Sequence, residues 1–102
     1  HGNDLFLVVP IAIHEAALGS KIEIPTFDGR GRVRIPPGTQ SGQRFRLRGR
    51  GVPSLGSGPQ GDLIVEIRLV LPRLADERSK ELLREFGKLN PENVRKEFDK
   101  LP

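Results

Sequence analysis

The chain has 102 residues and a net charge of +4, with a composition (35% hydrophobic, 29% charged) typical of a soluble domain with a modest core. This length suits one small domain, which buries roughly 65% of the surface of its unfolded chain. The absence of cysteine excludes disulfides, thiolate zinc sites and thiol nucleophiles. No run approaches the ~18 apolar residues of a membrane helix, and His1–Asp4 shows no signal-peptide pattern, so we expect a cytoplasmic protein without membrane contact.

The first predicted element is a strand over residues 5–13, LFLVVPIAI, which is apolar on both faces. β-branched and aromatic residues over this length predict a strand that is covered on both sides. Pro10 cannot donate to a ladder, so it predicts a sheet edge or a bulge. Residues 14–18 predict a single helical turn, because Gly19 is suited to end it.

Alternating polar and apolar residues predict the remaining strands. Lys21–Ile24 and residues 30–35 flank Asp28-Gly29, a strong hairpin signal. A turn rich in proline and glycine precedes a short alternating strand that begins at Arg44, and a loop over residues 53–61 precedes the longest strand, residues 62–71. Five short strands separated by turns predict a mainly β fold, a two-layer antiparallel β-sandwich-like domain with one short helix.

After Pro72 the period of the pattern changes from two to 3.6 residues. One amphipathic helix is predicted, and Asn90-Pro91-Glu92 is typical of the start of a second short one. The apolar stripe of the first consists of Leu82, Leu83, Phe86 and Leu89, and that of the second of Val94, Phe98 and Leu101. We therefore expect a β-domain over residues 1–72 and a C-terminal helical tail over residues 73–102.

The longest recognisable motif is IPPGTQSGQRFRLRGRGVP, residues 35–53. It resembles the signature of the second C-terminal β-domain of DnaJ-type co-chaperones, including the CbpA-like members. Other stretches of the chain match that family in the same order. They are Gly2–Leu5, Ala16–Gly19, Ile24–Gly29, Gly61–Leu63 and Lys80–Phe86. The resemblance covers roughly residues 2–87 and implies a two-sheet β-domain with one short helix.

The resemblance also implies a role for the terminal helix. In this family the helix joins two copies into a homodimer, which assigns the stripe of Leu82, Leu83, Phe86 and Leu89 to a dimer interface. The alternative is that the stripe packs on its own β-domain. The family further implies a domain that helps present unfolded client proteins to a DnaK-type ATPase. That ATPase would be contacted through regions absent from this chain, which has no His-Pro-Asp tripeptide and no cysteine-rich zinc module.

Two further sets of residues are candidates for binding. Clients could add a strand to a sheet edge beside Ile22, Ile24, Phe45 and Leu47, although alternating apolar residues of this kind usually belong to the core. The arginine-rich strands could contact nucleic acid, or they could simply form a solvated outer face. The arginines concerned are Arg30, Arg32, Arg34, Arg44, Arg46, Arg48 and Arg50.

Several features argue against a dedicated nucleic-acid binder or an enzyme. No aromatic residue is interleaved on the arginine faces, and a net charge of +4 is low for a nucleic-acid-binding protein. His14-Glu15 is an isolated pair without converging catalytic partners, and no phosphate-binding loop or nucleophile elbow is present. We expect no enzymatic activity, no metal and no cofactor. A purely structural dimerisation module without client contact remains the third interpretation.

Overall fold

The computed structural model describes residues 2–53 and 60–102 and divides into two compact units, His1–Pro72 and Arg73–Pro102. Most of the loop predicted over residues 53–61 lies outside the described residues. The elements of the first unit are β1 (Leu5–Ala12), α1 (Ile13–Leu18), β2 (Ser20–Thr26), β3 (Gly29–Ile35), β4 (Arg44–Leu47) and β5 (Leu63–Val70). The second unit contains α2 (Glu77–Leu89) and a 3-10 helix (Lys96–Lys100). No helix in the described part of the chain is long and apolar enough to cross a membrane.

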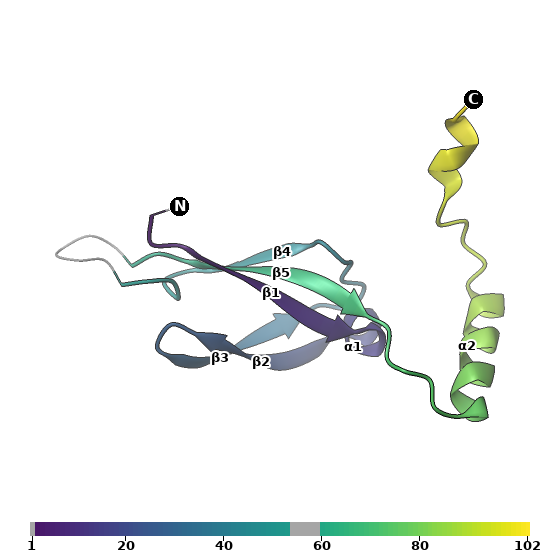
Figure 1. The fold of residues 1–102 in the computed structure, drawn as a ribbon, viewed down its shortest axis with the longest axis horizontal. Helices are drawn as coiled ribbons and strands as arrows, with labels where there is room; N and C mark the ends of the chain where they lie inside the picture. Colours follow the sequence, from purple (N-terminus) through teal and green to yellow (C-terminus); the bar gives the residue numbers. More distant parts are fainter. Residues whose placement is uncertain (1, 54–59) are drawn as a thin grey trace. The chain divides into compact units, whose positions relative to one another are not determined.

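The first unit consists of two small sheets that share one core (Figure 1). One sheet has the strand order β1-β5-β4, and the other is the β2–β3 hairpin. Alternating side chains from both sheets are buried between them, which confirms the predicted mainly β, two-layer fold with one short helix. The residues that are at least nine-tenths buried in this core are Val9, Ile11, Ala16, Ile24, Val33, Ile35, Leu63, Val65 and Ile67.

One strand pairing differs from the antiparallel arrangement that we predicted. β1 runs parallel to β5 over its whole length, whereas β4–β5 and β2–β3 are antiparallel. A parallel neighbour requires a long connection that returns the chain to the same end of the sheet. Here α1, the β2–β3 hairpin and β4 together supply that connection.

β1 is not covered on both faces, contrary to the sequence-based prediction. Val9 and Ile11 are buried, but Phe6 and Val8 are 64% and 54% exposed. The physical reason is that the β2–β3 sheet packs on only one face of the three-stranded sheet. Pro10 lies on this strand, and β1 is an edge strand, as the missing donor of proline predicted.

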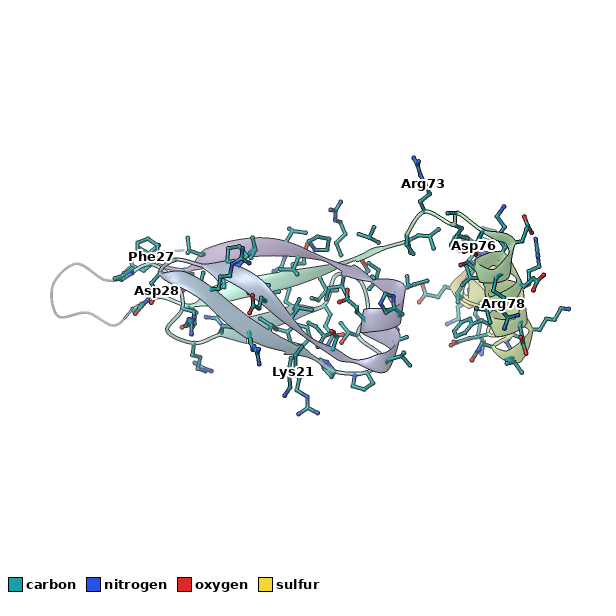
Figure 2. The ribbon with its side chains drawn as sticks, turned by 90° about the horizontal axis from the view of Figure 1, so that it is seen from below. Lys21, Phe27, Asp28, Arg73, Asp76 and Arg78 are labelled. Carbon is teal, nitrogen blue, oxygen red and sulfur yellow. The ribbon has the colours of Figure 1, made fainter. Side chains whose placement is uncertain are left out.

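The predicted short helix and the predicted hairpin turn are both present. α1 ends at Gly19, which adopts a φ of +84°, and Glu15 accepts a hydrogen bond from the Ala12 N–H at 3.0 Å. In the hairpin, Thr26 pairs with Gly29, so the turn residues are Phe27 and Asp28, one residue earlier than the Asp28-Gly29 signal indicated. These two side chains lie at the tip of the hairpin (Figure 2).

We predict that Ile67→Ala lowers the free energy of unfolding by about 2–5 kcal/mol, because it leaves a cavity between the two sheets. Val70→Ala, on the same strand but 39% exposed, is the matched control and costs less than about 1 kcal/mol. Urea denaturation followed by circular dichroism measures both. Equal losses in the two variants would contradict the position of the core.

Candidate interaction surfaces

Three stretches that lie far apart in the sequence meet where β1 and β5 begin and β4 ends. The Asp62 carboxylate accepts a hydrogen bond from the Gly49 N–H at 2.8 Å and pairs with the Arg46 guanidinium at 2.7 Å. The Asp62 N–H in turn donates to the Asp4 carboxylate at 2.7 Å. We call this cluster the Asp62 junction; it consists of Asn3, Asp4, Arg46, Gly49, Val52, Gly61 and Asp62.

Backbone hydrogen bonds and close backbone contacts also hold the Asp62 junction together. The Asn3 carbonyl accepts a hydrogen bond from the Val52 N–H at 2.7 Å. A Cβ at Gly51 would lie 2.6 Å from the same carbonyl oxygen, and one at Gly61 would overlap the Asn3 backbone. Only glycine fits at these two positions, because any side chain would push the start of β1 away from β5.

The charges of the Asp62 junction stabilise each other. The Gly49 N–H and then the Arg46 guanidinium hold the pKa of Asp62 below its ordinary value of 3.8. The hydrogen bond to Asp62 in turn raises the pKa of Arg46. Three of the family motifs, Gly2–Leu5, residues 35–53 and Gly61–Leu63, therefore contribute to one structural cluster. The sequence gives no signal that these three motifs meet, because their contact depends on how the strands pair.

The predicted arginine surface is divided between the two sheets. On β4, Arg44 forms an ion pair with Glu66 at 2.9 Å, and Arg46 belongs to the Asp62 junction. β4 ends at Leu47, and Arg48 is exposed beyond it. The Arg50 guanidinium approaches the Thr26 hydroxyl and the Arg30 carbonyl oxygen at 3.5 and 3.4 Å, so it does not share the outer face of β4.

The remaining arginines lie on β3. Arg30, Arg32 and Arg34 are exposed on the face opposite the buried Val33 and Ile35. In the described part of the chain, none of the three forms an ion pair. The seven arginines therefore do not form one continuous surface, and the unpaired ones are concentrated on the β2–β3 hairpin.

A groove of about 430 Å³ lies between the edge strand β1 and the neighbouring β2. Its walls come from residues 7–10 on β1 and residues 22–25 on β2, with Glu15 of α1 at one side. Most of the lining side chains are apolar. Such a groove beside an open sheet edge is the type of site at which an extended peptide can add a strand.

The structure separates the four candidate client-binding residues into two pairs. Ile22 and Ile24 line the β1–β2 groove, although Ile24 is only 2% exposed and also belongs to the core. Phe45 and Leu47 lie on β4, at the other edge of the three-stranded sheet, and are half-buried against the core. Val8, Pro10 and Pro25 also line the groove but were not predicted. Pro10 was the available signal, because proline in a strand marks an edge.

In the second unit, α2 has caps at both ends and an apolar stripe. The Asp76 carboxylate accepts a hydrogen bond from the Ser79 N–H at 2.7 Å, which lowers the pKa of Asp76. The Asn90 side chain donates to the Phe86 carbonyl at 2.8 Å. No residue of α2 is buried: Leu83 is half-buried, and Leu82, Phe86 and Leu89 are 48%, 58% and 73% exposed.

The second predicted helix is present only as the 3-10 helix Lys96–Lys100, and it begins later than Asn90-Pro91-Glu92 indicated. Asn90 instead caps the end of α2, which explains why a new helix does not start there. The apolar residues of this segment, Val94, Phe98 and Leu101, are all exposed.

Comparison with known proteins identifies the family. Residues 1–72 match the family described as the DnaJ C terminal domain. The chain belongs to this family. The resemblance to DnaJ-type C-terminal domains that the sequence motifs indicated is thereby confirmed.

Several DnaJ relatives match nearly the whole chain. It is 52% identical over 91 residues to the Chaperone protein DnaJ of Caldicellulosiruptor bescii, an alignment that covers 89% of this chain and 24% of that protein. For the Chaperone protein DnaJ of a Ruegeria species the identity is 47%, over 94% of this chain and 25% of the relative. For that of Roseobacter denitrificans it is 50%, over 90% and 24%. The chain thus spans about a quarter of the length of these DnaJ proteins.

We predict that Asp62→Asn destabilises the first unit at pH 7. We also expect the free energy of unfolding of the variant to fall less than that of the parent between pH 7 and pH 2.5. Because the folded-state pKa of Asp62 is depressed, its contribution is fully present above its ordinary pKa and disappears as the pH falls through the lowered value. Urea denaturation at pH 7, 4 and 2.5 measures the effect. Asp28→Asn is the control at pH 7, because that carboxylate accepts one exposed hydroxyl hydrogen bond and loses less. Equal stability of Asp62→Asn and the parent at pH 7 would contradict the prediction.

Proposed function

We propose that this chain is the dimerising and client-presenting part of a DnaJ-type co-chaperone that works with a DnaK-type ATPase in protein folding. Membership of the DnaJ C-terminal domain family supports this assignment. The ATPase would be contacted through other parts of the longer protein. The observation that carries the dimerisation half of the proposal is the exposed apolar stripe of α2.

A dimer would supply a packing surface for the apolar stripe of α2, none of whose residues is buried. A helix of 13 residues is close to the ~12–15 residues below which isolated helices are marginal in water. Stability therefore has to come from packing of the apolar face against another surface. A second α2 offers the same stripe, and a two-fold axis would pair Leu82, Phe86 and Leu89 with their equivalents in an isologous interface.

The β1–β2 groove supports the client-presenting half of the proposal. An unfolded client offers unpaired backbone groups and apolar side chains, and the groove combines an open sheet edge with apolar walls. Pro10 cannot donate to an added strand, so pairing along β1 is interrupted at that residue. We therefore assign most of the binding to side-chain burial near Val8 and Ile22.

The nucleic-acid alternative is supported only by the unpaired arginines of β3. A duplex requires a continuous set of cations to neutralise successive phosphates. The division of the arginines between two sheets, and the carboxylate partners of Arg44 and Arg46, leave no such set. We expect weak and steeply salt-dependent binding at most.

We predict that the chain self-associates and that Phe86→Asp abolishes this association, because the new carboxylate would be buried without a partner at the centre of the stripe. Sedimentation equilibrium at micromolar concentrations measures the mass. Arg84→Asp is the control. It places the same carboxylate two residues before Phe86, on the polar side of the helix, and retains the dimer. A monomeric parent chain at high micromolar concentration would contradict the proposal.

We predict that an unstructured peptide with a central run of alternating leucine and valine shifts the amide resonances of residues 7–10 and 22–25. Val8→Glu weakens this binding several-fold, because it places a charge on the wall of the groove. Val70→Glu adds the same charge to an exposed position outside the groove and leaves the affinity unchanged. If the peptide causes no shifts along residues 21–24, the chain is a structural dimerisation module without client contact.

A further inference from the structure

A second hollow, of about 320 Å³, lies where the end of α1 meets the start of β2 and the end of β3. One wall is apolar and comes from Leu18 and Pro37. The other carries the Lys21 and Arg34 side chains. We call it the α1–β2 hollow. The β2 residues that line it, Ser20 and Lys21, are distinct from residues 22–25 of the β1–β2 groove.

The two cations of the α1–β2 hollow face each other directly. In the hairpin register Lys21 is the partner of Arg34, and both side chains are exposed. Like charges in directly opposite positions of an antiparallel pair destabilise the sheet. In the described part of the chain, neither cation forms an ion pair with a carboxylate. Figure 2 shows the Lys21 side chain extending away from the strands.

The observed hairpin register is what places Lys21 opposite Arg34. A turn centred on Asp28-Gly29, one residue later, would have shifted the pairing by two and placed Glu23 opposite Arg34. The observed turn of Phe27 and Asp28 instead pairs Glu23 with Arg32 and leaves Lys21 beside Arg34. The hairpin thus concentrates positive charge at the end that adjoins the hollow.

The C-terminal end of α1 adjoins the hollow, but most of its carbonyl groups already accept hydrogen bonds. The last carbonyl groups of α1 would normally repel an anion at this position. Here the Glu15 carbonyl accepts from the Gly19 N–H at 2.9 Å, and the Ala16 carbonyl accepts from the Gly38 N–H at 2.9 Å. The Ala17 carbonyl also accepts from Gly38, at 3.2 Å. Three of the last four carbonyl groups of α1 are thus hydrogen-bonded, which reduces their repulsion of an anion in the hollow.

The apolar wall is held in place by tight local geometry. Gly19 has a φ of +84°, and a Cβ there would lie 3.0 Å from the Pro37 ring. The Thr39 hydroxyl, on a residue that is only 4% exposed, donates to the Pro36 carbonyl at 2.6 Å and fixes the turn that carries Pro37. A ligand would meet a largely preformed surface, which lowers the entropy lost on binding.

We propose that the α1–β2 hollow binds an acidic peptide segment. A carboxylate of the segment neutralises Lys21 and Arg34, and a neighbouring apolar side chain packs on Leu18 and Pro37. A single-stranded nucleic acid fits less well, because no aromatic side chain lines the hollow for base stacking and the apolar wall offers nothing to a phosphate backbone. The hollow shares no lining residue with the dimer stripe or the β1–β2 groove, so the proposal stands independently of the proposed function.

The test is a titration of the ¹⁵N-labelled full chain, followed by amide shifts, with an acetylated and amidated octapeptide. The peptide carries two glutamates flanking one leucine in a serine–glycine background. We expect saturable shifts at residues 18–21 and 34–37 that weaken with added salt. Arg34→Gln lowers the affinity by about two- to fivefold, as expected for one exposed ion pair, and Lys21→Gln with Arg34→Gln lowers it further. Arg68→Gln, which removes an exposed charge from the other sheet, leaves the affinity unchanged.

Two control ligands make the test decisive. The same peptide with glutamine in place of glutamate should not bind, and a single-stranded oligothymidylate of equal charge should bind more weakly. Tighter binding of the oligonucleotide to residues 18–21 and 34–37 would overturn the choice of an acidic peptide. Shifts confined to residues 7–10 and 22–25, equal effects of Arg34→Gln and Arg68→Gln, or no saturable shift at millimolar peptide would each overturn the site itself.

Discussion

The Asp62 carboxylate organises the first unit, because it connects the start of β5 with the end of β4 through Gly49 and Arg46. The Asp62 N–H extends the same cluster to Asp4, at the start of β1. Because these three chain segments are joined at one end, β1 and β5 start side by side and run in the same direction. The charge-assisted hydrogen bonds therefore favour the parallel pairing, together with the core side chains that the two strands share.

The position of β1 determines which surfaces remain open. As an edge strand it leaves the β1–β2 groove accessible, and since the second sheet covers only one of its faces, Phe6 and Val8 are exposed. The charges follow a similar division. Arginines on β4 have carboxylate partners within their own sheet, whereas Lys21 and the arginines of β3 have none in the described residues. Positive charge is thus available to a ligand on the hairpin and not on β4.

The second unit is too small to form a hydrophobic core. Thirty residues with a 13-residue helix bury none of their side chains fully, so the apolar stripe of α2 has no core of its own. The caps at Asp76 and Asn90 stabilise the ends of the helix but do not cover its apolar face. Packing against another surface is the remaining source of stability, and this is the physical basis for assigning α2 to assembly.

The sequence by itself determined the local structure. A continuous apolar run located β1, and alternation located the other four strands. Gly19 indicated the end of α1, Asp28-Gly29 indicated the hairpin to within one residue, and the stripe around Phe86 indicated α2. These features depend on neighbours in the chain, so composition and period are sufficient to predict them.

Only the tertiary structure decided which strand neighbours which. Period-two alternation shows which side chains share a face, but it does not specify the partner strand, its direction or the register. The parallel β1–β5 pair, the exposure of Val8, the ion pair of Arg44 with Glu66 and the opposition of Lys21 and Arg34 all result from such non-local choices. The groove and the hollow could not be predicted for the same reason, since each is formed by residues whose proximity depends on strand pairing.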